Sequence, residues 1–429
     1  MVFNILSSVC IWGSVLIVLL RLISNSGIPI KGLPGAVFAD KSLRGGFETG
    51  RKDTAAVFGL SLLFRLIVFL LSVLAIYIFK DSKFSWQNLI DEYLKWDANN
   101  YQRIAIGGYS YHVENGSDFT TLAFFPLYPW LIRLVNIIFR NEIVSGIIVS
   151  SLLYSGACCF LYKLMAMDYN RATAIRAVVF LSVFPHSLFL GVMMNESTLL
   201  FTLCGGFYFL RRHNWPLVGI FGVLAALSRL AGILLAIPAA VEWLEEYKIL
   251  DKLRQKKIGE VWRLFYSKGL WIFLMLLGTG IYLYCNYKTT GDWFKFLEYQ
   301  DRIWNNRSCY FGKGIQGIFE NYIEKDGYTR FAIWLPSIVS VIFAISALIY
   351  GLRRHKTMYS AFLVIYIMIN TGLTWPISVA RYMVCALPAF MILADFSERH
   401  KWSEHLLTAT MAIAFGIYFV AYFMGRQIL

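Results

Sequence analysis

Charged side chains are scarce in this sequence of 429 residues: only 15% are charged, whereas 58% are hydrophobic. Soluble domains carry roughly a quarter charged residues, so this chain has too few polar side chains to cover a surface in water. That excludes an ordinary soluble enzyme, a disordered chain and a nucleic-acid-binding module. We assign the formal net charge of +14 to membrane-protein loops that contact anionic lipid, and we expect no nucleic acid as a partner.

Several motifs that bind metals or nucleotides are missing. The sequence has no D-x-D, which removes the usual metal clamp for a nucleotide-diphosphate sugar, and no P-loop. It has no C-x-x-C and no histidine pair with metal-like spacing, and its seven cysteines are an odd number. Most of them lie in apolar runs, where cysteine is usually a small buried hydrophobic residue. We therefore predict neither a metal site nor a cofactor.

Long hydrophobic runs are abundant, and they predict an all-α polytopic membrane protein with about ten to twelve membrane helices. A spanning helix needs about 20 mainly apolar residues. The candidate spans are 2–23, 56–79, 143–165, 174–193, 197–211, 269–286, 331–351, 357–376, 382–396 and 403–424.

The basic residues predict the orientation of these spans. Lysine and arginine concentrate in segments 24–55 and 244–268, which we place on the cytoplasmic side. Two long loops, 80–142 and 287–330, then face the outer or luminal side. Within the first of them, residues 122–139 contain two prolines and Arg133, and we interpret them as a helix that lies along the outer interface.

Residues 216–243 are flanked by basic segments on both sides, so both flanks should lie inside. A hairpin of two helices of about 14 residues satisfies this, because each is too short to cross at 1.5 Å per residue. Its turn falls at residues 228–232, which places Arg229 inside the membrane and toward the outer half.

The first outer loop contains the leading catalytic candidate. Asp97 follows Trp96 close to the membrane surface. A carboxylate there can accept a proton from a hydroxyl, and a neighbouring aromatic ring can exclude water and stack on a sugar. Arg103 and Tyr109 follow in the same segment as candidate binding residues. Taken alone, the residue type of Asp97 also fits a solvated acid in a loop.

Three more ionisable residues lie where apolar runs meet the predicted outer face: Glu196, Arg229 and Arg381, the last beside Tyr382. Ionisable residues in a membrane are costly and mark functional candidates. The structural alternative is a salt bridge, for instance between Glu196 and Arg229. Arg65 lies nearer the middle of its span, which favours a structural role.

As a set, one acid and two arginines near apolar runs fit sugar transfer from a lipid phosphate. Arginines suit a phosphate group, and an acid beside them suits the activation of an acceptor hydroxyl. The phosphate leaves as an anion, so no second carboxylic acid is needed, unlike in glycosidases.

The residues of the first outer loop carry a resemblance to a known family. W-D-A-N-N-Y-Q-R-I-A-I-G-G-Y-S-Y followed by A-F-F-P-L-Y-P resembles the signature of the GPI mannosyltransferase 2 (PIG-V) family, closer to its bacterial branch. Shorter matches follow in the same order: F-P-x-S-L-F-L with N-E-S, L-S-R-L-A-G, G-D-W-F-K-F with Q-D-R-I-W, and R-Y-M-V-C-A-L-P-A-F. Together they cover roughly residues 56–396.

The resemblance implies a GT-C glycosyltransferase fold and a polyprenyl-phosphate sugar as donor. It implies that Asp97 is the catalytic acid of the first outer loop, acting as general base on the acceptor. Arg229 matches the family's arginine in the short-helix region, and Arg381 with Tyr382 matches its Arg-Tyr pair. With Trp96, Arg103, Tyr109 and Glu196, these are the predicted substrate-binding residues.

The sequence therefore predicts a membrane glycosyltransferase, a mannosyltransferase that inverts the anomeric centre, with a lipid-linked or glycan acceptor. We expect an extra N-terminal helix and loop (1–55), a catalytic membrane domain (56–396) and a C-terminal membrane helix (397–429). A bacterial plasma membrane is favoured over the endoplasmic reticulum, with the site on the outer or luminal side. The alternatives are a lipid transporter or flippase and a non-catalytic scaffold of a glycan-assembly complex.

Overall fold

A computed structural model describes residues 1–30, 45–79, 85–109, 111–114, 117–325 and 327–428. The chain is helical almost throughout, which confirms the predicted all-α class. The strands among the described residues are β1 (Tyr111–Glu114) and β2 (Ser117–Thr120), which form one antiparallel hairpin with Tyr111 opposite Thr120.

Six helices in the described ranges are long and apolar enough to cross a membrane. They are α1 (Val2–Asn25), α2 (Arg51–Phe79), α6 (Glu142–Ala166), the continuous Ile258–Thr290 that contains α12 (Ile258–Leu264) and α13 (Leu270–Thr290), Arg330–Gly351 that contains α16 (Leu335–Gly351), and α20 (Trp402–Phe423). Each overlaps a predicted span. The protein is therefore an integral membrane protein.

The expected ten to twelve membrane helices exceed this number. The other predicted spans form shorter or broken helices: α7 (Arg171–Val183), α8 (Glu196–Arg211), α17 (Thr357–Thr371), and the pair α18 (Val379–Tyr382) and α19 (Leu387–Arg399). The last two are joined through a 3-10 turn and bend by 74° at their break. α7 ends before Pro185, which lacks the N–H that a continuing helix needs. These segments are apolar because they are largely buried inside the protein. An apolar run in the sequence therefore does not by itself show that the helix is long enough to span the membrane.

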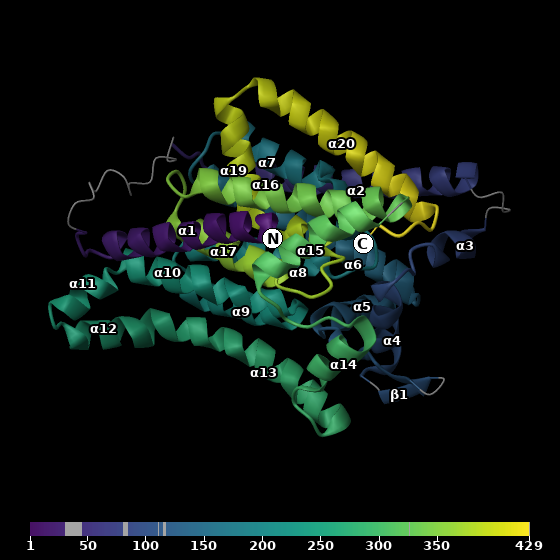
Figure 1. Ribbon diagram of the computed structural model, residues 1–429, viewed down its shortest axis with the longest axis horizontal. Helices are drawn as coiled ribbons and strands as arrows, with labels where there is room; N and C mark the ends of the chain where they lie inside the picture. Colours follow the sequence, from purple (N-terminus) through teal and green to yellow (C-terminus); the bar gives the residue numbers. More distant parts are fainter. Residues whose placement is uncertain (31–44, 80–84, 110, 115–116, 326, 429) are drawn as a thin grey trace.

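The remaining helices are short and connect or cover the spans. They are α3 (Trp86–Asp91), α4 (Asp97–Gly107), α5 (Leu127–Phe139), α9 (Trp215–Ser228), α10 (Ala236–Glu246), α11 (Ile249–Arg254), α14 (Lys295–Trp304) and α15 (Phe311–Glu324). In Figure 1, α11 and the start of α12 lie at one end of the long axis, and α3 lies at the other end, with β1 on the same side as α3. The second basic segment and the first long loop therefore lie far apart, and the side of the membrane that each faces stays a prediction.

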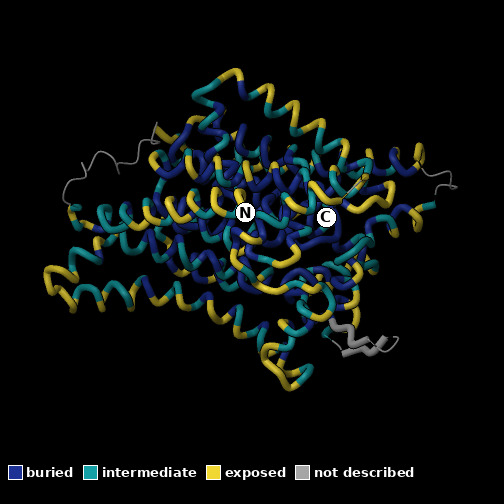
Figure 2. The backbone as a smooth tube through the Cα atoms, in the orientation of Figure 1, coloured by how far each residue is buried: buried dark blue, intermediate teal, exposed yellow. Residues whose placement is uncertain are grey.

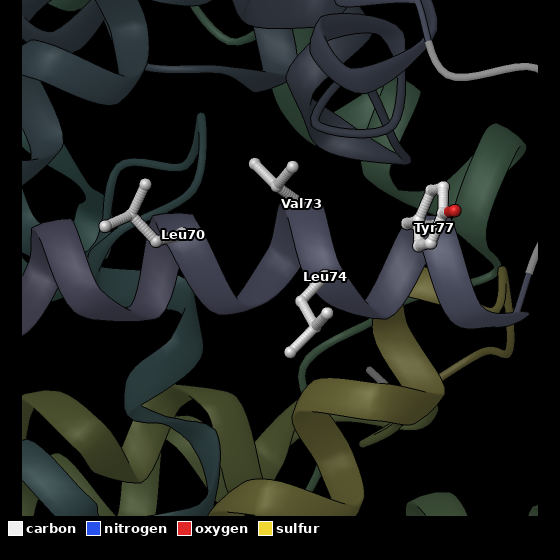
Figure 3. A pocket seen from close by; sticks show the side chains of 4 residues that line it. All are labelled: Leu70, Val73, Leu74 and Tyr77. Carbon is white, nitrogen blue, oxygen red and sulfur yellow. The ribbon is translucent and has the colours of Figure 1, made fainter.

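The interior includes a large cluster of buried apolar side chains, in which α8 packs against α6 and α9, and α17 packs against α10 and α16. Figure 2 shows buried backbone through this centre and exposed positions along outer helices such as α13 and α20. Exposed apolar side chains on α2, including Leu70 and Leu74, are what a lipid-facing helix requires. With Val73 and Tyr77 they line a shallow apolar cavity of about 380 Å³ (Figure 3).

The predicted hairpin within residues 216–243 is present. α9 ends at Ser228, a 3-10 turn covers Leu230–Leu235, and α10 returns the chain. The two ends meet, because Trp215 Nε1 donates a hydrogen bond of 2.9 Å to the Tyr247 hydroxyl. At the tip, a Cβ added to Gly232 would lie 1.8 Å from the carbonyl oxygen of Ala225, so only glycine fits this close turn.

Candidate active site

Four ionisable side chains from distant parts of the sequence meet in one cluster: Asp97, Glu196, Arg229 and Arg381. Arg381 Nη2 donates a 2.7 Å hydrogen bond to Asp97 Oδ2, and its Nε lies 3.1 Å from Glu196 Oε1. Arg229 Nη1 donates to the same Glu196 oxygen at 2.8 Å. We call this set the charged cluster. The structure thus brings together four residues that the sequence analysis selected separately.

Two helix N-termini position the carboxylates of the charged cluster. Asp97 is the first residue of α4, and Glu196 is the first residue of α8. The positive end of a helix dipole stabilises a negative side chain in its first turn. Each carboxylate therefore has a favourable backbone field in addition to its arginine.

The four side chains differ in how accessible they are. Glu196 and Arg381 are almost fully buried, with side chains 1% and 4% exposed, whereas Arg229 is 20% and Asp97 26% exposed. The buried pair holds the base of the cluster, and Asp97 and Arg229 form its accessible rim. A substrate that enters would meet one carboxylate and one guanidinium first.

The charges of the cluster are formally balanced, yet its hydrogen bonding is incomplete. Arg381 Nη1 and Glu196 Oε2 are buried without a hydrogen-bond partner, and Arg381 Nε lies near Glu196 without hydrogen-bond geometry. Unsatisfied charged groups in a low-dielectric site are costly. The cluster therefore leaves hydrogen-bonding capacity unused on both Arg381 and Glu196.

Aromatic rings surround the guanidinium groups. The Tyr382 ring centroid is 4.2 Å from the guanidinium carbon of Arg229 and 5.3 Å from that of Arg381. The Phe189 ring lies 5.4 Å from Arg381. These contacts orient both cations, and they place Tyr382 in the site as the sequence analysis expected.

Trp96 adopts an unusual backbone conformation directly before Asp97, with φ at 50°. Non-glycine residues rarely occupy this region, and such strain concentrates at functional sites. The indole ring is fixed by contacts with Tyr422 at 5.2 Å and Phe189 at 6.3 Å between ring centroids. Tyr422 comes from α20, a partner that local sequence patterns around Asp97 could not reveal.

The two halves of the first-loop signature hold each other in place. The Tyr109 hydroxyl donates a 2.6 Å hydrogen bond to the carbonyl oxygen of Phe124, and burial raises the pKa of Tyr109 well above its ordinary value, so it stays a donor. Arg133 donates to the carbonyls of Ile104 and Ala105 near the C-terminal end of α4. Tyr109 thus positions the loop in this structure.

The remaining predicted residue, Arg103, lies exposed on α4. It follows Asp97 by six residues, which turns it about 240° around the helix at about 100° per residue. Arg103 and Asp97 therefore project from different faces of α4.

Two residues of the site were missed from the sequence. Asn195 donates from Nδ2 to the Ser228 carbonyl at 2.9 Å and accepts from Arg229 Nη1 at 3.2 Å, which ties the hairpin tip to the start of α8. Tyr101 packs edge-on against Phe124 and Tyr128, and burial, followed by the charge of Asp97, raises its pKa. Both belong to motifs quoted for the resemblance, W-D-A-N-N-Y and N-E-S, which could have drawn attention to them.

One group of possible metal ligands exists in the described ranges, at the base of the hairpin. Ligand atoms of His213, Glu242 and Glu246 lie within 4.8 Å of one another. Lys356 Nζ contacts Glu242 Oε1 at 3.0 Å, so a cation already neutralises the buried carboxylate. This group is separate from the charged cluster.

The fold of this chain is similar to that of ArnT from Cupriavidus metallidurans bound to undecaprenyl phosphate, with a TM-score of 0.50, 16% identity and coverage of 83% of this chain. The chain spans 63% of the length of that ArnT chain. The chain therefore shares the fold of that ArnT structure over most of its own length.

In sequence, residues 125–282 match the family described as dolichyl-phosphate-mannose-protein mannosyltransferase. The match runs from α5 to α13, so it includes Glu196 and Arg229 but not Asp97 or Arg381. No curated protein matches the chain.

Two archaeal structures from Archaeoglobus fulgidus are also similar. One is an oligosaccharyltransferase in the apo form, with a TM-score of 0.44, 12% identity, and coverage of 88% of this chain and 56% of that chain. The other is oligosaccharyltransferase AglB in complex with an inhibitory peptide and a dolichol-phosphate, with a TM-score of 0.43, 10% identity, and coverage of 87% and 55%. The fold assignment rests on ArnT.

Proposed function

We propose that the protein is a membrane glycosyltransferase that moves a hexose, mannose, from a polyprenyl-phosphate donor to a lipid-linked or glycan acceptor. The observation that carries the proposal is the charged cluster: a partly exposed carboxylate bonded to a buried arginine that has an unpartnered N–H group. The family match over residues 125–282 and the undecaprenyl phosphate named for ArnT support this donor class.

Arg381 and Arg229 would bind the donor phosphate. A guanidinium group matches phosphate oxygens in a bidentate geometry and stays charged at all relevant pH values. Arg381 Nη1 is already buried without a partner, so phosphate binding would satisfy it. Arg229 at the hairpin tip is the more exposed of the two and would meet the phosphate first.

Asp97 would act as general base. Its Oδ2 accepts the bond from Arg381, and the exposed part of the carboxylate remains open to an acceptor hydroxyl. The acceptor oxygen gives its proton to Asp97 and forms a bond to the anomeric carbon. The bond from that carbon to the phosphate oxygen breaks, and polyprenyl phosphate leaves with the electron pair. Direct displacement inverts the anomeric centre, so a β-linked donor gives an α-linked product.

The arginines would also stabilise the transition state. Negative charge grows on the leaving phosphate as the glycosidic bond breaks, and fixed cations in a site shielded from water stabilise such charge strongly. Tyr382 and Phe189 keep the guanidinium groups in place. We further propose that the chain is a bacterial-branch member of the PIG-V family, on the motifs W-D-A-N-N-Y and A-F-F-P.

The proposal is tested with purified protein in nanodiscs, given polyprenyl-phosphate mannose labelled in the sugar and an extract of membrane glycolipids. We expect labelled sugar on a second lipid or glycan together with free polyprenyl phosphate. If only polyprenyl-phosphate glucose supports transfer, the transferred sugar is glucose and not mannose. Passage of donor across the bilayer without any transfer would favour a flippase.

A further inference from the structure

The side chains that α20 buries lie at its two ends. The helix runs along the outer edge of the molecule (Figure 1), and most of its residues are exposed or half-buried. Its buried residues are Ser403 near the start and Phe419, Tyr422 and Phe423 near the end. Tyr422 has no exposed surface, so the last turn of α20 docks into the protein although the middle of the helix faces outward.

Tyr422 contacts both residues that precede Asp97. Lys95 Nζ donates a 2.7 Å hydrogen bond to the carbonyl oxygen of Tyr422, and it lies 4.8 Å from the centroid of the Tyr422 ring. The same ring packs edge-on against the Trp96 indole, with 5.2 Å between the ring centroids and an angle of 81° between the rings. One residue of α20 therefore holds two consecutive residues of the first outer loop at the point where α4 begins.

The backbone of Trp96 needs such support. Its φ of 50° and ψ of −117° lie outside the regions that a residue with a side chain usually occupies. A conformation of this kind persists only where the surrounding structure holds it. Asp97 follows directly as the first residue of α4. Rotation of the Trp96 backbone to an ordinary conformation would therefore change where the Asp97 carboxylate points.

Tyr422 also connects this loop to the arginine side of the charged cluster. Its ring centroid lies 6.3 Å from that of Phe189, and Phe189 lies 6.3 Å from Trp96. The Phe189 ring in turn lies 5.4 Å from the guanidinium carbon of Arg381. We call Trp96, Phe189 and Tyr422 the aromatic triad. Edge-on aromatic pairs have a preferred geometry, so the Tyr422 ring restricts both of its partners.

We propose that Tyr422 is a positioning residue for Asp97: through the aromatic triad, its ring keeps the proposed base in reach of Arg381 and of the acceptor hydroxyl. The proposal rests on the transfer reaction proposed above. The ring carries this role and the hydroxyl does not, because Tyr422 Oη is buried without a hydrogen-bond partner. Tyr422 acts through Trp96, so loss of its ring should lower kcat and leave donor binding by the arginines largely intact.

The test compares purified Tyr422→Ala, Tyr422→Phe and Phe419→Ala with wild type in the labelled transfer assay. Tyr422→Ala should lose about 10-fold to 10²-fold in kcat, since misplacement of a reacting group by about 1 Å can cost as much, while the donor KM stays close to wild type. Tyr422→Phe should keep the wild-type kcat.

Phe419→Ala is the matched control, because it removes another buried ring of α20, one that lies beside Phe415 and Phe423. It should lower the melting temperature and keep the wild-type kcat. An equal loss of kcat in Tyr422→Ala and Phe419→Ala would overturn the proposal, and so would a loss in Tyr422→Phe as large as that in Tyr422→Ala.

A second variant covers the case in which Tyr422→Ala fails to fold. Tyr422→Leu keeps an apolar side chain in the buried space but has no ring, so it should fold and show the same split between kcat and donor KM. A wild-type kcat in Tyr422→Leu would overturn the proposal.

Hydrogen exchange separates this proposal from the proposed reaction, because exchange needs no turnover. The backbone amides of residues 97–101, followed by mass spectrometry, should exchange faster in Tyr422→Leu than in wild type and at the wild-type rate in Phe419→Ala. Unchanged exchange in Tyr422→Leu would refute the positioning role. Absence of transfer by the wild-type protein would instead refute the proposed reaction.

Discussion

Arg381 Nη2 donates a 2.7 Å hydrogen bond to Asp97 Oδ2, and this bond joins residues 284 positions apart in the sequence. It connects the start of α4 in the first predicted outer loop to α18, next to the bend between α18 and α19. Because Arg381 also lies beside Glu196, one guanidinium links the exposed carboxylate to the buried one. A phosphate that binds this guanidinium would therefore compete directly with the carboxylate of Asp97, the proposed base.

Loss of the Arg381 guanidinium should reduce turnover strongly. Arg381→Ala removes a cation aimed at the leaving phosphate, and removal of one such donor typically costs about 10²–10³-fold in rate. Arg381→Lys should recover only a small part, because an ammonium cannot bridge two acceptors in a planar fork. Initial rates with saturating donor measure this, and Arg307→Ala, an exposed arginine of the second outer loop, is the control. A turnover of Arg381→Ala within twofold of wild type would contradict the role.

Arg229 separates phosphate binding from simple charge neutralisation. Arg229→Ala leaves Glu196 beside Arg381, so we expect the variant to fold but to bind donor more weakly. Donor KM and the melting temperature are measured together. If Arg229 serves only to neutralise Glu196, the double change Arg229→Ala with Glu196→Ala would restore activity, and that rescue would refute the phosphate role.

The tip of the hairpin should tolerate no side chain. In Gly232→Ala the new methyl would lie 1.8 Å from the Ala225 carbonyl oxygen, and overpacking of this kind costs about 1–3 kcal/mol or more. Gly280→Ala on α13 meets no atom within 4 Å and is the matched control. The melting temperature should fall for Gly232→Ala and stay level or rise for Gly280→Ala. Equal melting temperatures would show that the turn relaxes without cost.

The sequence singled out the four residues that the structure brings together in the charged cluster, because ionisable side chains in or beside apolar runs are rare enough to be informative one by one. It also predicted the hairpin, since two basic flanks require the chain to turn back. It could not predict that Arg381 rather than Arg229 contacts Asp97, because that pairing depends on how α18 packs against Pro185–Leu190.

Other features follow only from three-dimensional packing. The apolar runs at 174–193 and 357–376 suggested full spans, but they form core helices of 13 and 15 residues. Tyr422 reaches Trp96 from the last helix, and Asn195 secures the hairpin tip. The quoted motif N-E-S includes Asn195, but only the fold reveals the contacts of either residue.

The orientation of the chain is open to chemical labelling. Cys309 lies in the second predicted outer loop and is partly accessible, so a membrane-impermeant thiol reagent should label it from the outer or luminal side. A cysteine introduced at the exposed Lys256 should react only from the cytoplasmic side. Labelling of both positions from one side would contradict the prediction that the two segments lie on opposite sides of the membrane.

The central claim is that the Asp97 carboxylate takes the acceptor proton, and the most direct measurement is the transfer rate of Asp97→Asn. Asparagine keeps the size of the side chain but removes the base, and general bases contribute about 10²–10⁴-fold. Asp91→Asn, which changes an exposed acid in α3 of the same loop, is the matched control.

With purified protein and labelled polyprenyl-phosphate sugar, we predict a loss of that size for Asp97→Asn and a near wild-type rate for Asp91→Asn. Both variants should show wild-type melting temperatures. Transfer by Asp97→Asn at the wild-type rate would contradict the account.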